Sequence, residues 1–178
     1  WGEVNLSTSF VVRDAAESVL DQAGPGAVLF TQEDNTTFAL AYLVAVEGGR
    51  PDLEIFDRAG NLFGTPYDRP LHQVAGDLAR YRKASDDVLV AGLLDQGREV
   101  VFTAPFLEFE PDGWRLVADG TVGRAVAGGR DDQPGSTLPP RPRRPAHPDW
   151  MSRQILAMDA VKRAASLVRS GDGLTAVA

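Results

Sequence analysis

Residues 27–58, AVLFTQEDNTTFALAYLVAVEGGRPDLEIFDR, contain the pattern that decides the fold. The short apolar run at 27–30 has the length and composition of a buried strand. A polar turn at 31–37 leads into a helical pattern over 38–46, and a second strand follows at 53–56. A strand, a helix and a second strand in this order predict a β-α-β unit whose two strands are parallel.

The ends of the central helix carry recognisable signals. Asn35, Thr36 and Thr37 are all suitable N-caps, because their side-chain oxygens can accept the unpaired amide protons of the first turn. Gly48-Gly49 ends the helical pattern and Pro51 prevents its continuation.

Both polar turns of this unit should lie at the carboxyl edge of the sheet, where open α/β sheets usually bind ligands. The candidate ligand-binding residues are Gln32, Glu33, Asp34, Asn35, Thr36, Asp57 and Arg58. Helix capping alone also explains a turn rich in Asp, Asn and Thr, so both interpretations remain open. The turn contains no glycine, which excludes a P-loop and a dinucleotide-binding fingerprint.

Residues 30–40, FTQEDNTTFAL, are followed by Tyr42-Leu43, Val46-Glu47-Gly48 and Arg50-Pro51-Asp52. This order resembles a signature of bacterial membrane proteins related to protein O-mannosyltransferases, approximately F-T-x-G-D-N-D-T-F-P-L-W-Y-x-x-x-V-E-G-x-R-P-D. The chain departs from that signature at Glu33, Thr36, Ala39 and Ala41, where the pattern has glycine, aspartate, proline and tryptophan.

The resembled family joins a multi-spanning membrane glycosyltransferase of the GT-C type to a soluble, extracytoplasmic carboxyl-terminal part. The resemblance implies that this chain is such a part, on the periplasmic side of the inner membrane. Its expected partners are the membrane-embedded part of the same protein and a protein or glycan acceptor. Because chemistry is expected in the membrane-embedded part, no catalytic residue is predicted here.

An independent α/β enzyme or small-molecule-binding domain is the alternative, and whether the chain is an enzyme stays open. Glu33, Asp34 and Asp57 are the carboxylates that such a protein could use as acid and base or as cation ligands. Neither G-x-S-x-G nor HExxH occurs, and the chain has two histidines and no cysteine. No cofactor and no metal site are therefore predicted.

Composition narrows the class of protein further. The 178 residues are 43% hydrophobic and 24% charged, which allows a sizeable core, and no apolar run is long enough to span a bilayer. Residues 1–129 hold 10 Lys/Arg and 20 Asp/Glu. Such an acidic part opposes binding to nucleic acid, which needs a basic face.

The remaining apolar pattern predicts further helices and strands around the β-α-β unit. A helix is expected at 10–23, capped by one of Ser7, Thr8 and Ser9. Two more are expected before the third strand: one starting at Pro70 and continuing to Tyr81, and one capped by Ser85-Asp86-Asp87 and ended by Gly97. Strands are expected at 99–103, 114–117 and 122–126.

The chain therefore divides into three predicted parts. Residues 1–127 form a three-layer α/β domain with a mainly parallel sheet. Residues 128–148 hold six of the twelve prolines and form a Pro/Gly/Arg-rich linker. Residues 149–178 begin a helical region, with a helix over 150–170 that packs only lightly on the domain and a second from 174. This spacing resembles half of a tetratricopeptide-like repeat.

Overall fold

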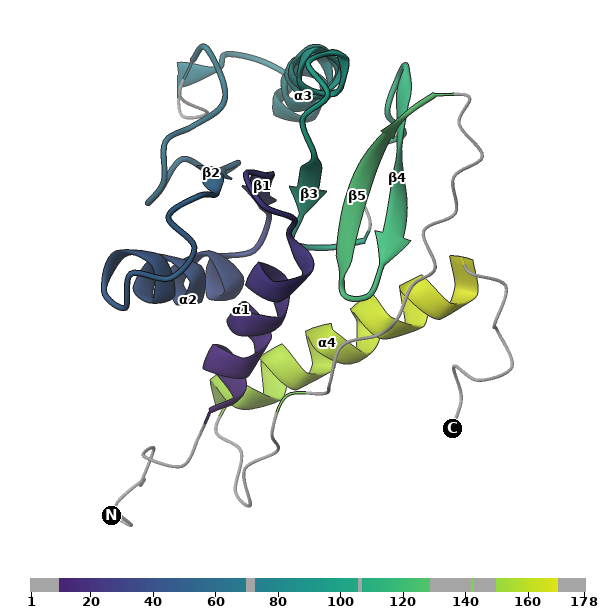
Figure 1. Cartoon of the computed structure of the whole chain (residues 1–178). Helices are drawn as coiled ribbons and strands as arrows, with labels where there is room; N and C mark the ends of the chain where they lie inside the picture. Colours follow the sequence, from purple (N-terminus) through teal and green to yellow (C-terminus); the bar gives the residue numbers. More distant parts are fainter. Residues whose placement is uncertain (1–9, 70–72, 106, 129–141, 143–149, 170–178) are drawn as a thin grey trace.

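The structure, a computed structural model, describes residues 10–69, 73–105, 107–128, 142 and 150–169. It has a mixed α/β fold in which a five-stranded sheet carries helices on both faces (Figure 1). In chain order the elements are α1 (Val11–Gln22), β1 (Val28–Thr31), α2 (Asp34–Ala45), β2 (Glu54–Asp57), α3 (Leu78–Asp95), β3 (Val100–Phe102), β4 (Trp114–Asp119), β5 (Val122–Ala127) and α4 (Trp150–Arg169).

The strand order is β2-β1-β3-β5-β4. β1 pairs in parallel with β2 and with β3, so that Leu29 lies opposite both Ile55 and Val101. This confirms the three predicted parallel strands. β5 is antiparallel to β3 and to β4. The sheet is therefore mixed, with a β-hairpin at one edge.

The two faces of the sheet bury two separate hydrophobic clusters. Leu29 points toward α1 and α2 and packs with residues such as Leu20 and Leu40. Phe30 points the other way, toward α3, and stacks on Phe102 with ring centroids 5.1 Å apart. A strand covered on both faces is apolar at every position, which explains the uninterrupted run at the start of the β-α-β unit.

The Arg-Pro-Asp segment of the signature has a structural role. The Arg50 guanidinium donates three hydrogen bonds of 2.5–2.9 Å to backbone carbonyl oxygens at the end of α1, those of Leu20, Ala23 and Gly24. It also pairs with the carboxylate of Asp52 at 2.9 Å, which holds the pKa of Asp52 well below its ordinary range. This contact fastens the loop before β2 to the end of α1.

The start of α2 differs from the prediction. The helix begins at Asp34, and its N-cap is Glu33, whose backbone is extended and whose side chain makes no capping hydrogen bond. The expectation that Asn35, Thr36 or Thr37 caps the helix is wrong, because all three lie within its first turn. Thr37 donates instead to the backbone carbonyl of Glu33 at 2.8 Å.

Within the described residues before β3, one α-helix, α3, stands where two helices were expected. Asp77 caps it by accepting a hydrogen bond from the Arg80 amide at 3.1 Å. Ser85, Asp86 and Asp87 lie in the middle of α3, so their predicted capping role is wrong. The carboxylate of Asp86 binds Arg58, and that of Asp87 accepts from the Trp114 indole, both from other elements.

The last helix packs more closely on the sheet domain than expected. α4 contacts α1 and β4, and its buried residues include Ser152, Ile155 and Lys162. The light packing predicted for it is therefore wrong. The caps predicted at 7–9, the helix start at Pro70, nearly all of the linker at 128–148 and the second helix from 174 lie outside the described residues. Within those residues, no helix is both long enough and apolar enough to cross a membrane.

Candidate functional site

The carboxyl ends of β1 and β3 form the topological switch point of the sheet. From β1 the chain runs through α2 on one face to β2, and from β2 through α3 on the other face to β3. Loops diverge at such a point, which is where open α/β sheets bind ligands. Here the amide of Gln32 donates to the Thr103 hydroxyl at 3.0 Å, and that hydroxyl lies 3.4 Å from the Glu33 carboxylate.

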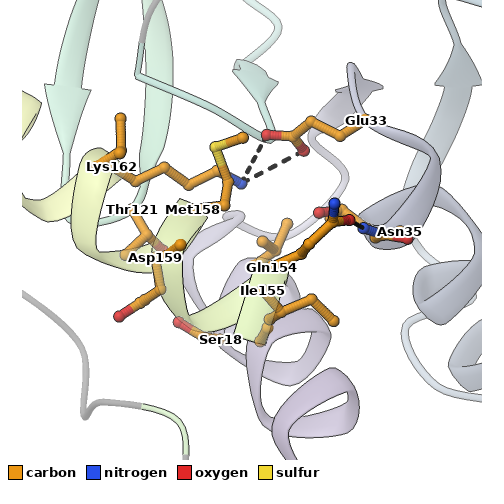
Figure 2. A pocket seen from close by; sticks show the side chains of 14 residues that line it. Ser18, Glu33, Asn35, Thr121, Gln154, Ile155, Met158, Asp159 and Lys162 are labelled. Carbon is orange, nitrogen blue, oxygen red and sulfur yellow. Dashed lines mark hydrogen bonds and ion pairs between the residues drawn. The ribbon is translucent and has the colours of Figure 1, made fainter. Parts of the chain in front are cut away.

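A lysine from α4 reaches into this point. The Nζ of Lys162 lies 3.0 Å from Oε1 of Glu33 and donates to the backbone carbonyl of Thr103 at 2.5 Å. Its side chain is only 7% exposed. Figure 2 shows it extended toward the Glu33 carboxylate, alongside Met158. A buried ammonium and carboxylate in contact neutralise each other, so the pair fixes α4 over the switch point.

The larger of two cavities at this edge has a volume of about 350 Å³ and lies between α1, the start of α2, the β4–β5 turn and α4 (Figure 2). Its apolar lining comes from Ala15, Val19, Ile155, Ala157, Met158 and Val161. Its polar lining comes from Ser18, Glu33, Asn35, Thr36, Thr121, Gln154, Asp159 and Lys162. An apolar wall with a few hydrogen-bonding groups is the usual composition of a small-molecule site.

The smaller cavity has a volume of about 140 Å³ and lies against the carboxyl ends of the parallel strands. Its lining residues are Gln32, Glu33, Arg58, Ala59, Arg82, Ala104, Glu108 and Met158. Glu33 and Met158 line both cavities. The two cavities therefore adjoin at the Glu33–Lys162 ion pair.

Five of the seven sequence-predicted residues, Gln32, Glu33, Asn35, Thr36 and Arg58, line these cavities. Asp57 has a different role. It is 2% exposed, and its carboxylate accepts hydrogen bonds of 2.6–3.1 Å from the backbone amides of Ala59, Asn61 and Leu62. Asp34 lies exposed in the first turn of α2. Asp34 and Asp57 therefore do not join the other candidate residues in these cavities, and the Asp57 carboxylate instead holds its own loop.

Arg58 lines the smaller cavity from within a buried network. Its Nη2 donates to Asp86 at 2.7 Å, and its Nε donates to the Tyr67 hydroxyl at 3.3 Å. Tyr67 donates in turn to the other oxygen of Asp86 at 2.9 Å. Burial raises the pKa of the Tyr67 hydroxyl above its ordinary value. Arg58 therefore holds α3 against the end of β2, and it also forms part of the cavity wall.

Sequence reasoning missed the residues that α3 and α4 contribute, above all Arg82 and Lys162. On α4, the apolar Met158 and Val161 are exposed and line the larger cavity, while Lys162 is buried. A lysine is normally expected in solvent, so nothing in the local pattern identifies it. Within the described residues, no three His, Asp or Glu side chains come together as a possible metal-binding group.

Comparison of the chain with models of protein families, with curated proteins and with solved structures found no match. The proposals for function therefore rest on the sequence signature and on the geometry of the carboxyl edge.

Proposed function

We propose that this chain is a non-catalytic accessory domain of a bacterial membrane glycosyltransferase, located on the extracytoplasmic side, and that it binds part of a protein or glycan acceptor. The observation that carries the binding role is the larger cavity, whose volume of about 350 Å³ falls in the range of about 300–1,000 Å³ typical of ligand sites. The signature at residues 30–52 supports the link to glycosyltransferases.

The lining of the larger cavity suits binding better than catalysis. Asn35, Thr36 and Gln154 contribute neutral donors and acceptors to its lining, which match the hydroxyls of a sugar or the amides of a peptide. The Glu33 carboxylate is held by Lys162 and by the Thr103 hydroxyl. Because these contacts already occupy the carboxylate, a role as general base is disfavoured.

An exposed stripe on α2 favours assembly as a second role. Phe38, Tyr42 and Val46 follow one another at intervals of four residues and are 55%, 55% and 68% exposed. All three belong to the residues that carry the resemblance, yet the fold does not bury them. An apolar stripe of this kind is typical of a contact surface. The membrane-embedded part of the same protein is its proposed partner.

The alternative is an independent α/β enzyme or small-molecule-binding domain that uses the same edge. The coding sequence upstream of Trp1 separates the two proposals. Several membrane-spanning segments there would support the accessory domain, and their absence from the complete gene product would overturn it.

Binding in the larger cavity is tested by thermal shift with mannosides and with Ser/Thr-rich peptides. Ala157 lines the cavity on α4, so Ala157→Phe should obstruct it and abolish a ligand-induced rise in Tm. Ala160→Phe is the matched control, because Ala160 is exposed on the same helix and does not line the cavity. Equal ligand responses from both variants, or none from the unmodified chain, would contradict an acceptor site here.

A further inference from the structure

We infer that the smaller cavity is a binding site for an oxyanion, a phosphate or carboxylate group, with Arg82 as its principal ligand. This inference does not depend on the proposed function, because it concerns a different cavity and rests on Arg82 and Glu108, which do not line the larger one. Three features support it: the unpaired Nε of Arg82, the balance of charge around it, and the position and size of the cavity.

Arg82 has binding capacity that the fold does not use. It lies in the N-terminal half of α3 and its side chain is 23% exposed. Its Nε is buried and donates no hydrogen bond within the described part of the chain. Its carboxylate neighbour, Glu108, is 3.8 Å away and 73% exposed, so their ion pair is long and weak. A guanidinium presents a planar fork of N–H groups that matches an oxyanion in two parallel hydrogen bonds.

The other charges around the cavity cancel in pairs. Arg58 is compensated by Asp86 at 2.7 Å, and Glu33 is compensated by Lys162 at 3.0 Å. The charge of Arg82 also reaches Asp86, where it helps to offset the effect of burial on the pKa of that carboxyl. Among the described residues that line the cavity, this leaves the positive charge of Arg82 beside the solvent-exposed carboxylate of Glu108.

Position and size fit a small anion. The cavity lies beside the carboxyl ends of β1 and β3, next to Gln32 and Ala104, where α/β sheets usually bind ligands. A volume of about 140 Å³ admits a phosphate or carboxylate group but not a whole sugar or nucleotide. Glu108 would act as an internal competitor that leaves when an external oxyanion binds.

The test is a titration of the chain with sodium phosphate and, separately, with sodium acetate, at pH 7.5 and constant ionic strength. Thermal shift and calorimetry should show saturable binding of the anion at this one cavity. Because the chain carries a net charge of −7, non-specific anion binding elsewhere on its surface should be weak. Binding of phosphate alone would identify a phosphoryl site, whereas binding of both ions would identify a general oxyanion site.

Two changes at the cavity should act in opposite directions. Arg82→Gln should remove saturable binding, and Glu108→Gln should tighten it by up to about fivefold, because the competing carboxylate is lost. Arg80→Gln is the matched control. Arg80 is an exposed arginine two positions before Arg82 on the same helix, so this variant should bind as the unmodified chain does. Arg82→Lys keeps the charge without the planar fork and should bind more weakly.

Circular dichroism of each variant shows whether it is folded. If Arg82→Gln does not fold, Glu108→Gln and Arg82→Lys decide the question between them. The inference is overturned if neither anion binds saturably, if Arg82→Gln or Arg82→Lys binds as well as the unmodified chain, or if Arg80→Gln abolishes binding equally.

Discussion

Replacing Asp57 with alanine should destabilise the domain by about 2–4 kcal/mol, far more than an ordinary surface carboxylate would. Hydrogen bonds to a charged acceptor contribute about 1.5–3 kcal/mol each. Asp57 accepts three of them, from the amides of Ala59, Asn61 and Leu62. The three donor residues are exposed, so water can hydrate their amides once the loop relaxes, which lowers the sum.

Urea unfolding measures this loss as a shift of the midpoint at constant m. Asp57→Asn keeps one acceptor oxygen and should lose about half as much. Asp68→Ala, an exposed carboxylate eleven residues further along the chain, serves as the control and should stay within about 0.5 kcal/mol of the unmodified protein. A loss below about 1 kcal/mol for Asp57→Ala would refute the structural role and return Asp57 to the candidate ligand residues.

Three further predictions concern the switch point, the start of α2 and acid stability. Lys162→Met should lower the free energy of unfolding by about 3–5 kcal/mol, because it leaves the half-buried carboxylate of Glu33 without its cation. In a double-mutant cycle, the double variant Lys162→Met/Glu33→Gln should recover part of this loss. Asn35→Ala should cost less than about 0.5 kcal/mol, since its side chain does not cap α2. Thr37→Val should cost about 1 kcal/mol by removing the partly buried hydrogen bond to the Glu33 carbonyl, and equal losses for the two variants in urea melts would contradict this. Arg50 holds the pKa of Asp52 in the folded state below its value in the unfolded state. Asp52 therefore contributes stability that is present above about pH 4 and is lost as the pH falls through the folded pKa. Asp52→Asn should lose less stability than the unmodified chain when the pH is lowered from about 7 to about 2.

The β-α-β unit was predictable because its signals are local. The apolar run of β1 and the glycines after α2 depend on neighbouring residues in the sequence, and the structure confirms both strands and their parallel pairing. The structure also confirms the predicted strands β3, β4 and β5. Each of these elements is bounded by turn or breaker residues within a few positions.

The wrong caps predicted within α3 arise because two aspartates bind distant partners. Asp86 looks like a helix cap from its neighbours, but it binds Arg58, 28 positions away. Asp87 accepts from the Trp114 indole, 27 positions away. Aspartate favours caps only when its side chain is free to bind the local backbone, so these tertiary contacts allow α3 to continue through both residues.

The candidate site was only partly predictable for the same reason. The rule that parallel strands bind ligands at their carboxyl ends identified Gln32, Glu33 and Arg58 correctly as residues of that edge. It could not identify Lys162 or Arg82, because each reaches the edge from a helix whose position depends on the whole fold. The same rule could not show that Asp57 is no ligand residue, because that depends on the hydrogen bonds between its carboxylate and the backbone of its own loop.

The structure divides the residues that carry the family resemblance into two groups. Arg50 and Asp52 fasten the end of α1 and are fully explained by folding. Phe38 and Tyr42 are half exposed and line a groove of about 390 Å³ between α1 and α2. Asn35 lines both this groove and the larger cavity, so the two adjoin at that residue. A partner seated on α2 would therefore lie beside a ligand in the larger cavity, and the proposed roles in assembly and acceptor binding would meet at Asn35 rather than on opposite sides of the domain.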